Sequence, residues 1–276
     1  MWDEVRVEEM ARKILDFMSE KGEEWVYGDV RFVDDSSRSS RCTNGVSDSQ
    51  SQSECGFGCR VLTRDKDGRQ GWGFASSSLM EENDLKAAVD EAMKNGRANR
   101  ILQAPGLPEL SFEGPSDRGE YESEVEICPF SISFSEMEER LFKIDQALDR
   151  EGVIKRTGFI GSQKQDKYFY SSSGARLHQC ITHTGAGISV TVSGPEGRHQ
   201  TRSLPAPVGN WTQGGFEYLD ALKLEQNSER LYEEARRIVQ ARECPSGRFP
   251  VVLGPQMLAL LVHEVAGHAL ELDRAL

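Results

Sequence analysis

The chain has 276 residues, with 33 Lys and Arg against 45 Asp and Glu, and a formal net charge of −12 at pH 7. This length suffices for one large or two ordinary domains with substantial cores. The acidic balance argues against direct nucleic-acid binding, which needs clustered Lys and Arg. Apolar runs fall short of the roughly 20 residues that cross a bilayer, and the acidic start Met1-Trp2-Asp3-Glu4 differs from a secretory signal. We therefore expect a cytoplasmic protein with neither a membrane nor a direct nucleic-acid partner.

The six cysteines favour a chain without a disulfide framework. Their density is too low for a disulfide scaffold, and they form no C-x-x-C pair. Cys55 and Cys59 alternate with Phe57 and Val61, which predicts small apolar side chains on the buried face of a strand rather than metal ligands.

The first part of the chain predicts two helices that enclose several strands. The spacing of apolar residues is typical of a helix over about 5–19. A Ser-rich turn is expected around 35–40 and another turn over 65–68. A second helix should begin near Asn83 and end at Asn95-Gly96. The strand-like runs between these elements lie at 25–33, 41–46, 56–63 and 71–76.

The second part of the chain predicts a similar order after a connector. Residues 107–134 are polar, acidic and rich in proline, which indicates a connector. Ser135 and Glu138 form the capping box of the following helix. A loop rich in Gly and Pro is expected over 194–215, and a charged helix over about 228–242, with Ile238 inward. The strand-like runs lie at 153–160, 167–172, 175–182 and 185–193, with Ser172-Ser173-Gly174 as a turn.

This order of elements favours an α+β fold. Runs of strands bracketed by helices predict mostly antiparallel sheets flanked by helices, ending in a strand and helix that carry a metal motif. We divide the chain into an N-terminal segment (1–106), a connector (107–134), a central segment (135–242) and a final segment (243–276).

The final segment carries the clearest chemistry of the chain. Residues 248–253 predict a short buried strand, and Pro255 suits the first position of a last helix. That helix contains His263-Glu264-Val265-Ala266-Gly267-His268 in an apolar setting where burial is expected. Buried imidazole and carboxylate groups need partners. Two histidines around a glutamate therefore suggest a metal with its general base.

The spacing of the two histidines predicts a distorted helix. The zinc-protease pattern H-E-x-x-H places its histidines at i and i+4, whereas here they stand at i and i+5. On a regular α-helix those positions diverge by about 140°. A π turn pairs i with i+5, and Gly267 tolerates such a distortion. We predict a π-bulge or kink between Val265 and His268.

If the ion is zinc, His263 and His268 supply two nitrogen ligands and a third ligand comes from elsewhere. Glu264 then serves as the general base that takes a proton from water and passes it to the leaving amine. Glu271 and Asp273 follow one turn later, and either could orient a histidine. The alternative interpretation of the pair is two core histidines bonded to backbone carbonyls.

The other histidines, at positions 178, 183 and 199, are scattered in strand and loop patterns, and we interpret them as structural. Cys180 and Cys128 stay open as candidates for the third ligand, although nothing in the sequence points to either.

Two stretches near the end of the chain, 250–255 and 261–273, carry a specific likeness to a known family. Their residues, Pro-Val-Val-Leu-Gly-Pro and Leu-Val-His-Glu-Val-Ala-Gly-His-Ala-Leu-Glu-Leu-Asp, resemble the TldD/PmbA family of metalloproteases, also called modulators of DNA gyrase. Weaker matches lie at 56–62, 71–76, 171–174 and 213–216.

The resemblance implies roles for three residues. His263 and His268 match the zinc ligands and Glu264 matches the catalytic base of the TldD-type subunit; the PmbA (TldE)-type lacks the motif. The family implies cytoplasmic hydrolysis of unfolded or short peptides. It also implies a homodimer, or a heterodimer with a PmbA (TldE)-like subunit.

The resemblance further implies that this chain is an N-terminal portion. The family's third zinc ligand is a cysteine in a long C-terminal domain, of which 243–276 would be only the start. We therefore expect an incomplete Zn²⁺ site and an inactive chain on its own. The alternative is a non-catalytic peptide-binding or assembly module that pairs with a family partner.

Overall fold

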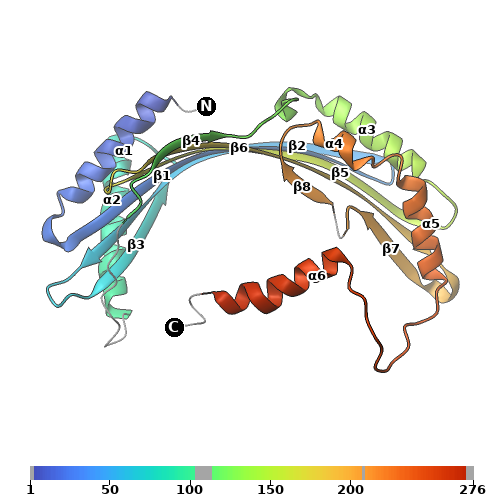
Figure 1. Ribbon diagram of the computed structural model, residues 1–276. Coiled ribbons are helices and arrows are strands. Elements are labelled where there is room, and N and C mark those ends of the chain that lie inside the picture. The colour runs from blue at the N-terminus through green and yellow to red at the C-terminus, as the bar shows by residue number, and fades with distance from the viewer. Residues whose placement is uncertain (1–2, 103–113, 207–208, 272–276) are drawn as a thin grey trace. The chain divides into compact units, whose positions relative to one another are not determined.

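The computed structural model describes residues 3–102, 114–206 and 209–271 (Figure 1). They fall into two compact units, Met1–Gln240 and Ala241–Leu276, which are described separately. In chain order the first unit contains α1 (Glu4–Ser19), β1 (Trp25–Thr43), β2 (Val46–Arg64), β3 (Gln70–Ser77), α2 (Glu82–Asn99), β4 (Arg118–Glu122), α3 (Phe134–Ala147), β5 (Val153–Ser171), β6 (Arg176–Ser193), β7 (His199–Leu204), β8 (Asn210–Gln213), α4 (Tyr218–Leu222) and α5 (Ser228–Val239).

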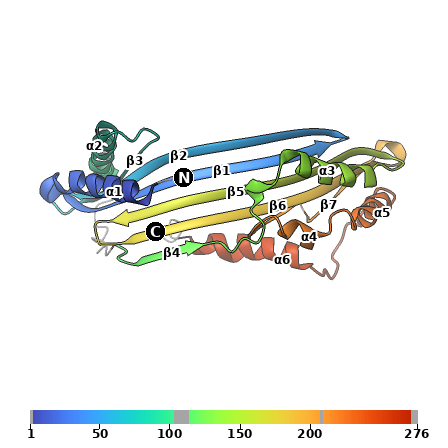
Figure 2. The ribbon, with the colours of Figure 1, turned by 90° about the horizontal axis from the view of Figure 1, so that it is seen from above.

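One sheet organises the first unit (Figure 2). Its eight described strands run in the order β3-β2-β1-β5-β6-β4, and β7 and β8 also pair with β6. Antiparallel pairing prevails, and β4 alone is parallel to its neighbour β6. The expected α+β fold with mostly antiparallel pairing and flanking helices is confirmed. The two strand runs predicted before and after the connector belong to this one sheet, because β1 pairs with β5.

The four central strands are longer than the sequence predicted. The Ser-rich turn expected around 35–40 is wrong, since β1 continues to Thr43 between β2 and β5. Both neighbours supply backbone hydrogen-bond partners there, and these outweigh the weak strand propensity of serine. The true turn is Asn44-Gly45, with φ of 48° and 78°. Positive φ at both positions is the signature of a two-residue type I′ hairpin.

The same correction applies to the later strands. The four runs predicted between 153 and 193 are two long strands, β5 and β6, joined by the expected turn at Ser172-Ser173-Gly174. The predicted loop over 194–215 contains β7 and β8, which pair with β6. The predicted connector likewise contains β4. In each case a polar segment forms a strand because its backbone pairs with β6.

Two hydrophobic cores lie at opposite ends of the sheet. Val30, Phe32 and Cys42 are alternate residues of β1 and are buried against the helices. In the first core Val30 and Phe32 pack with α1 and α2. In the second core Cys42 packs with α3, α4 and α5. Between the cores, and on the opposite face, β1 carries mainly polar residues such as Asp35 and Ser37.

Helix α2 continues to Asn99, past the predicted stop at Asn95-Gly96. Gly96 is buried against β2 and β3, and a Cβ atom there would lie 2.9 Å from Thr63 Cγ2. A Cβ atom at Gly73 of β3 would lie only 1.9 Å from the carbonyl oxygen of Ala92. These glycines therefore permit close packing of the helix on the sheet instead of ending it.

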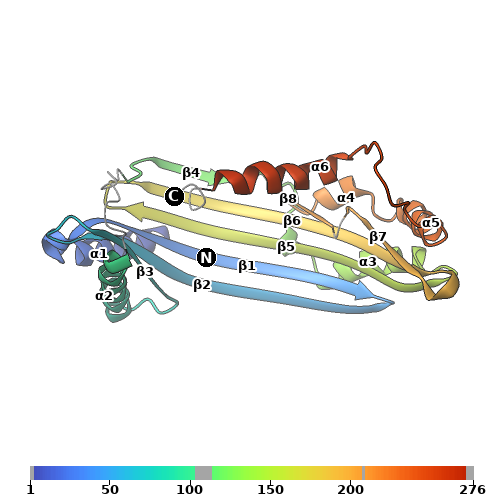
Figure 3. The same cartoon turned by 90° about the horizontal axis from the view of Figure 1, so that it is seen from below.

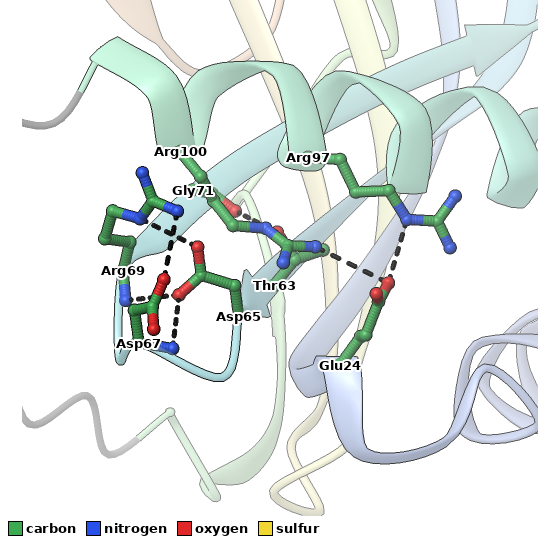
Figure 4. Close-up of polar contacts among 8 residues, drawn as sticks. All are labelled: Glu24, Thr63, Asp65, Asp67, Arg69, Gly71, Arg97 and Arg100. Carbon is green, nitrogen blue, oxygen red and sulfur yellow. Dashed lines mark hydrogen bonds and ion pairs between the residues drawn. The ribbon is translucent and has the colours of Figure 1, made fainter.

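A cluster of arginines fastens the end of α2 to the sheet (Figure 4). Arg100 is 6 % exposed, and its Nε donates to Thr63 Oγ1 at 3.0 Å. Its Nη2 lies 3.5 Å from a carboxylate oxygen of Glu24, which also accepts a 2.8 Å hydrogen bond from Arg97 Nε. That hydrogen bond from Arg97 is the main reason that the pKa of Glu24 is lowered. In the same view, Asp65 and Arg69 close the turn between β2 and β3.

Three smaller expectations are corrected by the fold. Ser133, not Ser135, caps α3, because its side chain accepts the N–H of Glu136 at 3.1 Å. Ile238 is 39 % exposed, and its neighbour Val239 faces the core instead. Cys55 is exposed, whereas the alternating residues 57, 59 and 61 are buried as predicted.

The second unit is described over 241–271. The strand predicted at 248–253 is wrong: these residues are extended and exposed, and no strand partner lies within the described part of the unit. Helix α6 (Pro255–Val262) begins at Pro255 as predicted. Its apolar side chains are largely exposed, since no other element of this unit packs on it. In the described part of the whole chain, no helix is long and apolar enough to cross a membrane.

Candidate metal centre

Helix α6 passes directly into a π turn. The turn covers His263–Gly267, and a 3-10 turn over His268–Leu270 follows. The N–H of His268 donates to the carbonyl of His263, which is the i to i+5 bond that the spacing required. The predicted π-bulge is therefore confirmed. Gly267 has ordinary helical angles (φ −59°, ψ −60°) and open space around its Cα, so the turn does not depend on glycine for its backbone conformation.

The π turn gathers three potential ligands. The rings of His263 and His268 lie with their centroids 4.6 Å apart and their planes at 78°. One ligand atom from each of these histidines and one from Glu264 all lie within 4.8 Å of one another. Two ligands of a tetrahedral zinc are separated by about 3.4 Å when the bonds are about 2.1 Å. The donor set therefore suits such an ion, because small side-chain rotations close the difference.

Glu271 holds one of the histidines in place. Its Oε1 lies 2.5 Å from Nδ1 of His268. The other ring nitrogen, Nε2, lies 3.8 Å from Glu264 Oε2. Nδ1 therefore donates to Glu271 and Nε2 faces the other two potential ligands, which is the usual arrangement around a metal-binding histidine. Asp273, the second candidate for this position, lies outside the described residues.

The remaining histidines and cysteines lie elsewhere. His178 stacks on Tyr168 with centroids 4.1 Å apart, and its Nε2 lies 2.6 Å from Asp166. Cys180 is buried in β6, where burial raises the pKa of its thiol. Cys128 is exposed within the segment predicted as the connector. Among the described residues, the one group with metal-ligand spacing contains none of these side chains.

A polar hollow on the open face of the sheet is a feature that the sequence analysis missed. It has a volume of about 1020 Å³ and is lined by residues of β1, β2 and β3. Asp29, only 2 % exposed, accepts hydrogen bonds from Nε and Nη2 of the Arg60 guanidinium there. The signal was the alternation of Asp29 and Arg31 with the apolar Val30 and Phe32, which assigns the odd-numbered residues to one face once the strand is known to be continuous.

Comparison with known proteins places the chain in a family. The model for PmbA/TldA metallopeptidase domain 1 matches residues 28–96, and the model for the PmbA/TldA metallopeptidase central domain matches residues 128–243. The chain belongs to the TldD/PmbA family. Among its relatives are a metalloprotease of Methanocaldococcus jannaschii, 24 % identical over 80 % of this chain and 46 % of the relative, and one of Methanothermobacter thermautotrophicus, 26 % identical over 79 % and 44 %.

Solved structures share the fold of this TldD/PmbA chain. A putative modulator of DNA gyrase from Bacteroides thetaiotaomicron superposes with a TM-score of 0.73 and 15 % identity, over 97 % of this chain and 57 % of that one. A putative modulator of a DNA gyrase from Thermotoga maritima gives 0.63 and 18 %, over 87 % and 50 %. The chain spans about half the length of the curated relatives it matches. Both matched family segments end before His263. The evidence for the metal centre is therefore its geometry and not the family match.

Proposed function

We propose that this chain carries part of the active site of a zinc-dependent peptidase that hydrolyses unfolded or short peptides. The observation that supports the proposal is the π turn, which brings His263, Glu264 and His268 to metal-ligand spacing. Membership of a metallopeptidase family agrees with it.

In the proposed mechanism His263 and His268 hold the zinc. Zinc, when bound, acidifies water and polarises the carbonyl that is to be cleaved. Glu264 accepts a proton from the attacking water and later delivers it to the nitrogen of the leaving amine. Glu271 keeps the proton of His268 on Nδ1, so that Nε2 offers its lone pair to the ion.

Two imidazoles and a base leave the site short of one protein ligand. We propose that this ligand is supplied by a part of the full-length protein beyond the residues described, as the family resemblance implies. We also propose a cytoplasmic location and assembly as a homodimer or with a PmbA (TldE)-like subunit. This chain alone should therefore hydrolyse peptides poorly, if at all.

The proposal is tested in the full-length protein by measuring zinc content and peptide hydrolysis together. His263→Ala should lose zinc and activity. Glu264→Gln should keep zinc while the rate falls by a factor on the order of 10² to 10⁴, because only proton transfer is removed. His199→Ala, in exposed β7, is the matched control and should change neither quantity.

The two outcomes separate the proposal from its alternative. Unchanged hydrolysis in both His263→Ala and Glu264→Gln would exclude a metallopeptidase. Absence of zinc from the parent protein would instead favour a non-catalytic peptide-binding or assembly module. The incomplete ligand set among the described residues is the observation that keeps this second function open.

A further inference from the structure

None of the described strands pairs with the outer edge of β2 over half its length. β3 pairs with β2 only from Phe57 to Arg64, whereas β1 pairs along its other side from Val46 to Thr63. Figure 3 shows β3 beside one end of β2 and none of the other described strands beside the rest. The free stretch, residues 47–55, is exposed apart from Ser49 and contains neither proline nor lysine, the usual protections of an edge.

The hairpin register shows which backbone groups point outward. Thr43 and Val46 flank the two-residue turn and are therefore a hydrogen-bonded pair, so even-numbered residues of β2 direct their N–H and C=O toward β1. At the other end of β2, the N–H of Asp65 donates to the carbonyl of Arg69 at 3.0 Å, which assigns odd-numbered residues to the β3 side. The free stretch thus presents the outward N–H and C=O groups of residues 47, 49, 51, 53 and 55.

The side chains of this stretch separate by face. Ser49 donates to Glu138 of α3 at 2.6 Å, so the odd-numbered side chains lie on the helix side. The even-numbered side chains lie on the polar face, where they line the hollow of about 1020 Å³ and an adjoining one of about 880 Å³. These side chains are Asp48, Gln50, Gln52 and Glu54.

The charges on the polar face favour a cationic occupant beside Glu54, whereas Asp48 already lies opposite Arg41 of β1. Glu54 lies directly opposite Asp35 of β1 in the antiparallel register, and like charges in that position destabilise a sheet. Neutral amides hold both carboxylates: Gln163 and Gln165 donate to Asp35, and Gln52 donates to Glu54. A strand added beside β2 would place alternate side chains next to Glu54, where a positive charge relieves the repulsion.

A second copy of the chain fits this edge less well in the register that overlaps the whole free stretch. Two β2 edges paired antiparallel about Ser51 would place Asp48 of each copy opposite Glu54 of the other. That arrangement adds two like-charge contacts to the pair already present, which disfavours it.

We propose that the outer edge of β2 over 47–55 binds an extended peptide by strand addition, with a Lys or Arg side chain beside Glu54. Main-chain hydrogen bonds supply the affinity and alternate side chains the selectivity, as in other cases of β-augmentation. This inference goes beyond the proposed hydrolysis, because the docking needs neither the metal nor Glu264.

The backbone part of the proposal is tested by fluorescence polarisation with a labelled eight-residue peptide of alternating Lys and Val, in the presence of a chelator. The peptide is N-methylated at every second residue. One of its edges can then pair with β2, while the methylated edge cannot pair with another copy of the peptide. Ser51→Pro removes an outward N–H without touching the β1 ladder and should weaken binding at least tenfold. Ser51→Ala keeps that N–H and should bind like the parent. Circular dichroism verifies that both variants fold.

The charge part of the proposal is tested with a further variant and a second peptide. Glu54→Gln should lower the affinity for the Lys peptide by about threefold, as expected for an exposed ion pair, and a Glu–Val analogue should bind more weakly than the Lys–Val probe. Equal binding of the parent and Ser51→Pro, or of a fully N-methylated probe, would overturn the inference. So would a parent dimer that Ser51→Pro dissociates while no peptide binds. Glu264→Gln must bind as the parent does, which separates this test from that of hydrolysis.

Discussion

We propose that Glu271 determines which nitrogen of His268 can reach a metal. The 2.5 Å contact between Glu271 Oε1 and Nδ1 of His268 orients the ring and leaves Nε2 toward Glu264. The 3-10 turn at His268–Leu270 makes this contact possible, since it places residues three apart on one side of the chain. The carboxylate therefore contributes to the site without entering the ligand group itself.

Glu271→Ala should weaken zinc binding by about 10- to 100-fold, the range typical of partners that orient a metal-binding histidine. Glu271→Gln retains a carbonyl oxygen that accepts from Nδ1 and should lose less. The measurement is competition with a chelator in the full-length protein, with exposed Glu243→Ala as the control. Equal zinc affinity in the parent and Glu271→Ala would show that the contact has no role in binding.

The cluster in Figure 4 offers a residue-scale comparison of two arginines on the same carboxylate. Arg100 is buried with its Nε on Thr63, whereas the Arg97 side chain is 52 % exposed. Arg100→Met should lower the free energy of unfolding by about 1–3 kcal/mol, because the buried Thr63 hydroxyl loses a hydrogen bond. Arg97→Met should cost less than about 1 kcal/mol, as an exposed ion pair does. Urea unfolding of both variants decides the point, and equal losses would contradict it.

At the scale of elements, the π turn forms without any need for glycine. Gly267 combines ordinary helical angles with open space, so Gly267→Ala should leave the melting temperature of the 276-residue chain unchanged or higher. Alanine favours the helix by about 1 kcal/mol over glycine. Zinc affinity should stay at the parental value. A loss of helix by circular dichroism would show that the turn does depend on glycine.

The later part of the connector is fastened to the start of α4 by one carboxylate. Glu217 accepts the N–H of Ile127 at 3.0 Å and that of Gly215 at 2.7 Å. Burial alone would raise the pKa of Glu217, but these backbone donors, led by Ile127, leave it lowered. A lowered pKa in the folded state means that the stabilisation is complete above the unfolded pKa of about 4.3 and is lost as the pH falls through the folded value.

Glu217→Gln should therefore destabilise the chain at pH 6, by about 1 kcal/mol or less for a carboxylate that is only half-buried. The difference from the parent should shrink as the pH falls from about 5 to 3. Urea unfolding at several pH values measures it, with the exposed Glu225→Gln as the matched control. A difference that is constant with pH would rule out this role for the carboxylate.

At the scale of the molecule, β1 and β5 join the two parts of the chain that the family models match separately. They pair from Asp29 with Ser171 to Thr43 with Thr157. The two cores lie at opposite ends of these strands. We expect the 1–240 unit to unfold in one transition. The division of this unit into two segments by a connector at 107–134 stays a prediction.

Leu141→Ala tests this coupling, because it should cost about 2–5 kcal/mol in the second core. Hydrogen exchange should then accelerate in α1 and α2 of the first core as well as in α3. Phe142→Ala removes a neighbouring side chain that is 47 % exposed and should change little. Faster exchange confined to the second core would instead support segments that fold independently.

The sequence predicted the helices and the metal motif better than the sheet. Helical stripes such as Met137, Leu141 and Ile144 depend on local spacing, and all three are buried. The π turn was predictable for the same reason, because helix geometry alone dictates it. The middle of β1, in contrast, is polar on both faces, and only pairing with distant strands makes it a strand. The third ligand is likewise beyond local reasoning, because nothing in the motif specifies it.

The π turn also has a consequence for how such a motif can arise. One residue inserted into a regular α-helix rotates everything beyond it by about 100°. The wider turn at His263–Gly267 absorbs that rotation, so the second histidine keeps the helical phase it would have without the insertion. A single codon therefore separates this motif from H-E-x-x-H, and gaining or losing it leaves the two histidines on the same side of the helix.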